Sequence, residues 1–266
     1  MDYSILNRKL DYYQRYKHLL PKEALQNYEA AFRVEYTHNS TAIEGNTLSL
    51  IETKLLLEDK ISVGGKDLRE IYEVTNHARA YDYTLRRAAE GRPIDENAVK
   101  DIHELLMENI MPGGIYHDVN VRIVGAGFQP PSPNEMYIQV KNFFADLPYK
   151  ADLPPIELAA WTHAEFVRIH PFKDGNGRAS RMIMNYQLLL SGCLPVSVPK
   201  EERLRYFEAL EAYAIGGDIQ PFAAFVAELE EKELDSMIEM IRQVRQNEHE
   251  SGQDDSDEDG WEEEEI

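Results

Sequence analysis

The sequence predicts a mainly α-helical protein with one short β segment. Apolar residues recur at the three- and four-residue spacing of helices through most of the 266 residues. Stretches that alternate valine, isoleucine or threonine with polar residues, the pattern of a half-buried strand, are rare. Gly or Pro stands at nearly every junction between the helical stretches. With 43% hydrophobic residues the chain can bury one substantial core, so we expect one compact body.

Start and stop signals place the helices along the chain. Pro154 and Pro155 begin the helix that leads to His170, because proline is tolerated at the first helical position. A turn begins at His170, and the next helix follows it. Gly192 and Pro195 end that helix. The expected helices cover residues 5–18, 22–37, 49–59, 66–90, 95–109, 134–146, 155–168, 177–191, 200–215 and 219–246.

One segment, residues 116–125, has the character of a strand. Val119, Val121 and Ile123 alternate there with polar residues, and glycines follow. A lone hairpin is marginal in water, so it must pack on the helical body. The segment is either a surface excursion or a flap whose exposed backbone pairs with an extended piece of another protein.

Charge and cysteine content exclude several classes of protein. The formal net charge is −20, but residues 248–266 hold eleven of the 48 acids and no Lys or Arg, which leaves 37 acids against 28 bases, or about −9, on the rest. That acidic tail should be disordered, and it either solubilises the chain or docks a basic partner. No basic face suited to duplex DNA is visible, and no apolar run is long enough to span a membrane. The single cysteine, Cys193, and a polar N-terminus indicate a cytoplasmic protein.

Residues 170–181, which read HPFKDGNGRASR, concentrate the groups that a protein needs to handle a nucleoside polyphosphate. A Gly-rich turn that opens a helix presents backbone N–H groups and the positive end of the helix dipole to phosphate oxygens. Asp174 is a hard oxygen ligand for a divalent ion, and His170 has a pKa suited to removing a hydroxyl proton. Arg178 and Arg181, three residues apart, can lie on one helix face and bind phosphates through their forked guanidinium groups.

These twelve residues resemble the signature of the Fic domain family, His-x-Phe-x-Asp/Glu-Gly-Asn-Gly-Arg-x-x-Arg, at every fixed position. Residues 40–46, Ser-Thr-Ala-Ile-Glu-Gly-Asn, resemble the family's inhibitory segment, Ser/Thr-x-x-x-Glu-Gly/Asn, in the class where that segment precedes the core. The resemblance implies a Fic-type helical bundle with a short β-hairpin flap over the active site. We therefore expect an N-terminal helical region at residues 1–95, which includes the inhibitory helix at about 37–46, and a catalytic core at 96–235. The end of the C-terminal helix follows at 236–247, and the acidic tail at 248–266.

The resemblance also implies transfer of AMP from ATP to a Ser, Thr or Tyr hydroxyl of a target protein or of the enzyme itself. His170 would act as general base, and Asp174 would hold Mg²⁺ across the phosphates. Tyr206 and Phe207 either stack on adenine or belong to the core. The phosphates would be held by Gly175, Asn176, Gly177, Arg178 and Arg181, where Asn176 adds a side-chain donor. The target would dock on the flap through Tyr116, Val119, Val121 and Ile123, and the resemblance admits a homodimer.

Self-inhibition is a further implied feature. Glu44 would occupy the guanidinium of Arg181 that the γ-phosphate needs, so ATP would bind only in an unreactive pose. Ser40, one helical turn earlier, would brace that end of the segment. Two other functions stay open. One is removal of AMP from a modified protein, with Glu44 orienting water, either alone or in a bifunctional enzyme that adds and removes AMP at the same site. The other is a non-catalytic module that senses ATP. An intact His170 argues against the sensor, because binding phosphate needs no base at that position.

Overall fold

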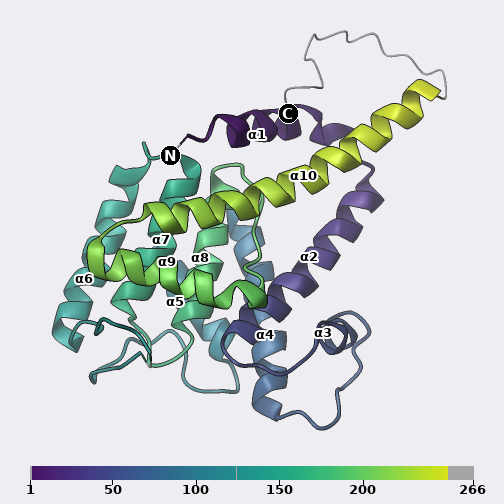
Figure 1. The fold of residues 1–266 in the computed structure, drawn as a ribbon. Coiled ribbons are helices and arrows are strands. Elements are labelled where there is room, and N and C mark those ends of the chain that lie inside the picture. The colour runs from purple at the N-terminus through teal and green to yellow at the C-terminus, as the bar shows by residue number, and fades with distance from the viewer. Residues whose placement is uncertain (1, 124, 251–266) are drawn as a thin grey trace.

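The computed structural model describes residues 2–123 and 125–250, with the backbone alone at 248–250. It confirms a mainly helical protein, and all ten expected helices occur in the described residues (Figure 1). Short 3₁₀ turns at Lys17–Leu19, Leu147–Lys150 and Lys200–Glu202 supplement them. The helices are α1 (Ser4–Tyr16), α2 (Lys22–Ile43), α3 (Leu50–Leu57), α4 (Leu68–Ala89), α5 (Glu96–Met107), α6 (Pro133–Asp146), α7 (Pro155–Ile169), α8 (Asn176–Leu190), α9 (Arg203–Gly216) and α10 (Gln220–Glu250).

Helices α7 and α8 form a central hairpin, and the turn between them carries most of the predicted site. Pro155 stands at the first position of α7, where a backbone N–H would have no helical acceptor. His170 ends α7 with a left-handed backbone at φ 53°, and Gly175 precedes α8 with another at φ 77°. Two left-handed residues so close together reverse the chain sharply and bring the start of α8 beside the end of α7.

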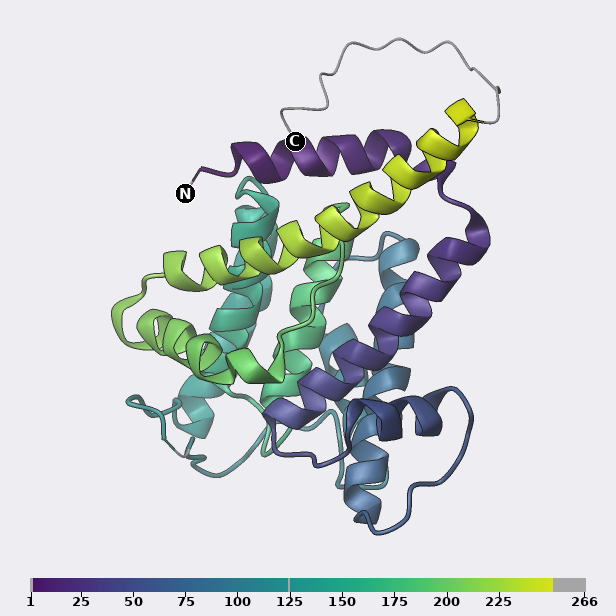
Figure 2. The ribbon, with the colours of Figure 1, turned by 45° about the vertical axis from the view of Figure 1, so that its right-hand side comes forward.

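Helix α8 is buried on nearly all sides because two apolar clusters meet on it. One cluster joins α8 to α1, α7, α9 and α10, and contains Met184 and Phe222. The other joins it to α2, α4, α5 and α6, and contains Phe172 and Ile183. Figures 1 and 2 show α10 crossing the top of the molecule, with α1 beside its C-terminal half. The first residues of α8 are therefore anchored by a helix that cannot shift without disturbing both clusters.

Helix α2 is longer than the sequence predicts. The pattern predicts a helix over 22–37 followed by a separate inhibitory helix, but α2 continues unbroken to Ile43. Its last turns are rich in polar residues that favour a break when the sequence is read alone, yet they are buried and bonded in the folded protein. For example, Asn39 Nδ2 donates to Ser197 Oγ at 3.0 Å. Glu44 is therefore held at the end of a long helix that is packed into the core.

The β-hairpin flap expected at 116–125 is not formed, and that prediction is wrong for the described residues of the segment, which contain no strand. Alternating apolar residues are not enough for a strand, because a strand also needs a partner to complete its hydrogen-bond ladder. This segment bonds elsewhere: His117 N donates to the Pro171 carbonyl at 2.9 Å, and Gly127 N donates to Glu211 Oε1 at 2.5 Å. The result is a loop tied at one end to residues 170–175 between α7 and α8, the predicted catalytic turn, and at the other end to α9.

Helix α10 also extends further than predicted. The disordered tail is expected to begin at residue 248, but α10 includes 248–250, so that boundary is wrong. The rest of the predicted tail, 251–266, lies outside the described residues.

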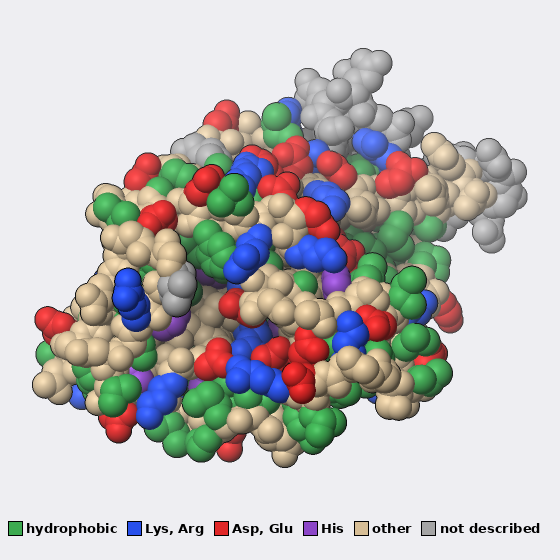
Figure 3. All heavy atoms as spheres, turned by 60° about the horizontal axis from the view of Figure 1, so that its bottom comes forward, with side chains coloured by type: hydrophobic (Ala, Val, Ile, Leu, Met, Phe, Trp, Pro, Cys, Tyr) green, Lys and Arg blue, Asp and Glu red, His purple; other side chains and the backbone are tan. Residues whose placement is uncertain are grey.

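The surface bears on the partners that the sequence excludes. On the face drawn in Figure 3, acidic and basic side chains are interspersed. That face has no continuous basic surface of the kind that duplex DNA requires. None of the described helices is long and apolar enough to cross a bilayer.

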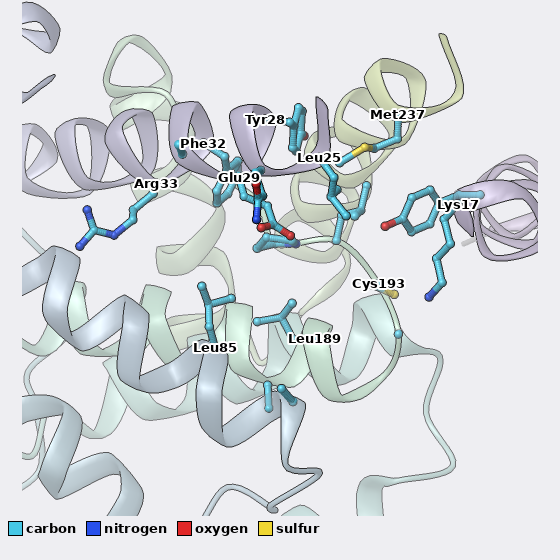
Figure 4. Close-up of a pocket in the computed structure, with 18 of the residues that line it drawn as sticks. Lys17, Leu25, Tyr28, Glu29, Phe32, Arg33, Leu85, Leu189, Cys193 and Met237 are labelled. Atoms are coloured by element: carbon cyan, nitrogen blue, oxygen red, sulfur yellow. The ribbon is translucent and has the colours of Figure 1, made fainter. Parts of the chain in front are cut away.

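A cavity of about 690 Å³ lies between the N-terminal half of α2 and the C-terminal end of α8 (Figure 4). Its wall is mostly apolar and includes Leu25, Phe32, Leu189 and Met237. The cavity is lined by none of the predicted site residues. It is separate from the catalytic turn, which lies at the other end of α8.

Candidate active site

His170 lies in the turn between α7 and α8 with one ring nitrogen free for chemistry. Its Nδ1 is 3.2 Å from the Val167 carbonyl oxygen. Because that oxygen can only accept, Nδ1 carries the proton and Nε2 keeps its lone pair. Burial lowers the pKa of His170 below its ordinary value, opposed in part by the Val167 carbonyl and by Glu44. The imidazole is therefore neutral near pH 7, which is the form that a general base needs.

Two buried side chains hold the catalytic turn in shape. The Asn176 amide accepts from the Phe172 backbone N–H at 2.9 Å and donates to the Phe172 carbonyl at 2.8 Å. His103, from α5, stacks on the Phe172 ring with centroids 3.5 Å apart. Its Nδ1 accepts from the Gly114 amide at 2.9 Å, so its Nε2 donates to the Asp174 carbonyl, also at 2.9 Å. The Asn176 side chain is thus bonded within the turn, whereas it was expected to donate to a phosphate. Only the backbone N–H of Asn176 remains available to an anion.

His103 is a positioning residue that the sequence did not reveal. It falls on the apolar stripe of α5, four residues after Val99 and three before Leu106, where a histidine reads as part of the core. Burial lowers the pKa of His103 to about 4, so the ring is neutral, in agreement with the tautomer that its two bonds require. A histidine on a core-facing stripe was the available signal, and it does not indicate which loop the ring supports.

Asp174 presents an ionised carboxylate beside the start of α8. Its Oδ1 accepts from the Gly175 amide at 2.6 Å and from Arg178 Nη2 at 3.3 Å, and its Oδ2 accepts from Arg69 Nη2 at 2.5 Å. Burial opposes ionisation, but Arg178, the Gly175 amide and Arg69 outweigh it and hold the pKa of Asp174 below its ordinary value. An ionised oxygen ligand that is 39% exposed suits Mg²⁺, which commonly takes one or two carboxylates together with substrate phosphates. The remaining ligands would come from phosphate and water, since no group of three potential protein ligands occurs in the described residues.

The N-terminus of α8 is suited to anions, and a carboxylate of the chain itself lies against it. The first amides of a helix have no intrahelical acceptors, and the helix dipole makes that end positive. A Cβ at Gly177 would clash with Glu44 Oε1, so the absence of a side chain there leaves room for the carboxylate. Gly175 is constrained as well, since its φ is positive and a Cβ would lie 3.0 Å from Met107 Sδ. The Gly-Asn-Gly turn therefore makes space for an anion, and Glu44 lies at that position.

Arg181 is 1% exposed and is bonded by residues of two other helices. Its Nε donates to Ser40 Oγ at 2.9 Å, and its Nη2 donates to the Ser40 carbonyl at 2.7 Å. Nη2 also donates to Glu44 Oε1 at 2.8 Å, and Nη1 donates to Tyr206 Oη at 3.1 Å. The structure thus brings Ser40 and Glu44 of the predicted inhibitory segment into direct contact with Arg181.

Arg178 has a different set of partners. Its side chain is 2% exposed and forms ion pairs with Asp174, at 3.3 Å, and with Glu73 of α4, at 3.5 Å. The two arginines were expected to share one helix face, but Arg178 and Arg181 have no partner in common. Arg178 therefore borders the Asp174 side of the site, and Arg181 borders the Glu44 side.

Tyr206 and Phe207 differ in what they can offer a nucleotide. The Tyr206 hydroxyl accepts from Arg181 and, having one proton, donates to His163 Nε2 at 3.0 Å. Tyr206 is therefore a core residue that braces Arg181. Phe207 is 41% exposed and lies 5.2 Å from the Arg203 guanidinium, so its ring stays accessible to a ligand.

The four residues expected on the flap do not form one surface. Tyr116 is buried and lies 5.3 Å, ring centre to ring centre, from Phe172 below the catalytic turn. Val121 and Ile123 are half-buried, whereas Val119 is 54% exposed. Of the four, Val119 is the side chain most available to a docked protein.

Comparison with known proteins identifies the family of this chain. Residues 93–188, from the loop before α5 almost to the end of α8, match the Fic/DOC family. The solved structure of a Fic-1 fragment from C. elegans is 32% identical, with a TM-score of 0.74 over 89% of this chain and 71% of that chain. The chain belongs to the Fic/DOC family. The family segment begins after Glu44 and ends before Tyr206, so the candidate site described above combines residues inside and outside it.

Other Fic proteins are similar as well. A Fic domain containing signaling protein from Bacteroides thetaiotaomicron has a TM-score of 0.81 and 27% identity over 90% of this chain and 97% of that chain. The protein adenylyltransferase Fic of Drosophila willistoni is 33% identical over 208 residues, which are 77% of this chain and 41% of that protein. The Drosophila melanogaster protein of the same name gives 33% identity over 77% of this chain and 42% of its own length. The chain thus spans about two fifths of the length of these curated relatives.

Proposed function

We propose that this Fic protein is a protein adenylyltransferase that transfers AMP from ATP to a Ser, Thr or Tyr hydroxyl of a target protein or of itself. The observation that carries the proposal is the arrangement of one turn, where a neutral His170 with a free Nε2, the ionised Asp174 and the anion-binding start of α8 lie together. The name of the Drosophila relatives, protein adenylyltransferase Fic, supports the same reaction.

In the proposed reaction the target hydroxyl oxygen bonds to the α-phosphorus of ATP as the bond from that phosphorus to pyrophosphate breaks. His170 Nε2 takes the hydroxyl proton while the new bond forms. The amides of Asn176 and Gly177 bind phosphate oxygens, since the Gly175 amide is already bonded to Asp174. When bound at Asp174, Mg²⁺ supplies positive charge that offsets the charge on the phosphates and on the departing pyrophosphate.

Glu44 inhibits the reaction in this proposal. Its Oε1 accepts from Arg181 Nη2 at 2.8 Å and lies against Gly177. The terminal phosphate of ATP would otherwise bind at this position. The Glu44 side chain is 34% exposed, so it can rotate away without unpacking α2. Arg181 would then keep its bonds to Ser40 and Tyr206 and stay oriented for the phosphate.

The proposed docking place for a target protein is the loop that starts at Tyr116. The bond from His117 N to the Pro171 carbonyl ties this loop to the catalytic turn, so a segment bound along the loop would lie near His170. Val119 would supply exposed apolar contact. A homodimer, a cytoplasmic location and the division of the chain at residues 95 and 235 stay predictions.

Transfer of label from ATP labelled at the α-phosphate tests the proposal. In the presence of Mg²⁺ the wild type should label itself weakly and Glu44→Gly strongly, whereas Glu44→Gly combined with His170→Ala should give no label. Glu35→Gly is the matched control, because Glu35 is an exposed carboxylate on the same helix and its loss should leave labelling at the wild-type level. Equal labelling of all these proteins would refute the proposed function.

Removal of AMP from a modified protein is the second candidate. It is favoured by the part-exposed Glu44 carboxylate at the start of α8, which can orient a water molecule toward the phosphorus of an AMP-modified side chain. Water would add to the phosphorus, and the protein hydroxyl and AMP would separate. Given an adenylylated target, the wild type should then release AMP and Glu44→Gly should not; release by both proteins would contradict a role for Glu44.

A further inference from the structure

The carboxylate proposed to hold Mg²⁺ is already paired with a cation of the chain. Arg69 Nη2 lies 2.5 Å from Asp174 Oδ2, while the Gly175 amide and Arg178 bond to the other oxygen, Oδ1. A divalent ion on Oδ2 would lie within a few Å of the Arg69 charge, and like charges at that separation repel strongly. Arg69 and a divalent ion therefore compete for the same oxygen.

The two arginines on Asp174 differ in how freely they can move. Arg178 is 2% exposed and enclosed between Asp174 and Glu73, so displacing it would leave buried charges unpaired. Arg69 lies on the first turn of α4 with its side chain 58% exposed. It can swing into solvent, where its charge is hydrated, and so only Arg69 can leave Asp174 at low cost.

Arg69 is also tethered close to the oxygen that it covers. Its Nε donates to Glu73 Oε1 at 3.2 Å while its Nη2 reaches Asp174. Glu73 is fixed in turn, because its Oε2 accepts from the buried Asn46 side chain at 3.0 Å. The Glu73 contact keeps the guanidinium beside Asp174 and favours its return when a divalent ion departs.

We propose that Arg69 is a tethered cation that competes with the divalent ion at Asp174 and thereby sets how much Mg²⁺ strengthens nucleotide binding. The inference rests on the proposed function, because it places the nucleotide and Mg²⁺ at this site. Exposed ion pairs contribute modestly, so removing the Arg69 charge should change the effect of Mg²⁺ on nucleotide affinity by about two- to fivefold.

Calorimetric titration with α,β-methylene ATP, whose α–β linkage cannot be cleaved, tests the inference without any transfer of AMP. The dissociation constant measured in EDTA, divided by that measured in Mg²⁺, gives the contribution of the metal. This ratio should rise about two- to fivefold in Arg69→Gln and by less in Arg69→Lys. It should not change in Arg79→Gln, because Arg79 is an exposed arginine of the same helix that pairs with Glu108.

Three results would overturn the inference: an unchanged ratio in Arg69→Gln, a reduced ratio, or a rise that Arg79→Gln shares. A reduced ratio is the outcome if Arg69 merely orients Asp174 for the metal. Asp174→Asn should bring the ratio close to one, and adding Arg69→Gln to it should have no further effect. The titration needs no catalysis, so the two proposals can fail separately. If the ratio rises in Arg69→Gln but the protein transfers no AMP, only the proposed function is refuted. If the protein transfers labelled AMP but the ratio is unchanged, only this inference is refuted.

Discussion

Tyr206 offers a direct test of how Arg181 is held. Its hydroxyl accepts from Arg181 and donates to His163, and these two partners are 1% and 0% exposed. Tyr206→Phe removes the oxygen and leaves both nitrogen atoms in the core without that partner. A buried polar group that loses its partner costs about 1–3 kcal/mol, and more when it is charged, so the free energy of unfolding should fall by about 3–5 kcal/mol.

Urea denaturation followed by circular dichroism measures this loss. Tyr213→Phe is the matched control on the same helix. The Tyr213 hydroxyl donates to the Glu165 carboxylate at 2.9 Å, and this contact is only part-buried. Because the acceptor is charged, loss of this bond should cost about 1.5–3 kcal/mol, which is less than the loss expected for Tyr206→Phe. If Tyr206→Phe cost no more than Tyr213→Phe, the Tyr206 hydroxyl would not be the brace between Arg181 and His163.

Three other perturbations test the turn, the base and the core. In a Glu44→Gly background the lowered pKa of His170 predicts a transfer rate that falls with decreasing pH around a midpoint below pH 6.5, and a rate that already halves above pH 6.5 would contradict it. His103→Phe can keep the stack on the turn but loses both ring hydrogen bonds, so it should destabilise by about 2–3 kcal/mol in urea and slow labelling; unchanged labelling would argue against a positioning role. Glu230 accepts from the Leu194 amide, and burial raises its pKa from 4.5 to about 8, so the folded state holds a proton that the unfolded state releases above pH 4.5. The resulting loss of folding stability is absent below pH 4.5, grows with pH and levels off above about 8. Glu230→Gln should therefore stabilise the fold by on the order of 3 kcal/mol at pH 7 and by very little at pH 4. An equal effect at both pH values would refute this role of Glu230.

The helices and the catalytic turn could be predicted because their signals are local. Proline at the start of α7 and glycine after α8 mark element ends wherever they occur, and helical spacing of apolar residues extends over whole helices. The end of α2 could not be predicted this way, since its polar last turns are helical only because partners such as Ser197 satisfy them. The segment at 116–125 failed for the opposite reason: its local pattern suits a strand, but its backbone bonds to the catalytic turn.

The site residues also differ in whether the local sequence predicts their contacts. His170 and Asp174 were predictable as neighbours because one short turn carries both. The contact between Glu44 and Arg181 joins residues 137 positions apart, and it was expected from family resemblance rather than from spacing. The place of Arg69 on Asp174 depends on how α4 packs against the turn between α7 and α8, and no local pattern encodes that packing.

In the proposed mechanism Arg181 is shared between the Glu44 carboxylate and the γ-phosphate of ATP. The most direct measurement compares the affinities for α,β-methylene ATP and α,β-methylene ADP, which differ by that phosphate, in wild type, Glu44→Gln and Glu44→Gly. Removing the Glu44 charge should strengthen binding of the ATP analogue by about tenfold more than binding of the ADP analogue, since a bond to a charged group is worth about 1.5–3 kcal/mol. Equal strengthening of the binding of both analogues, or strengthening of neither, would contradict the sharing of Arg181 between Glu44 and the γ-phosphate.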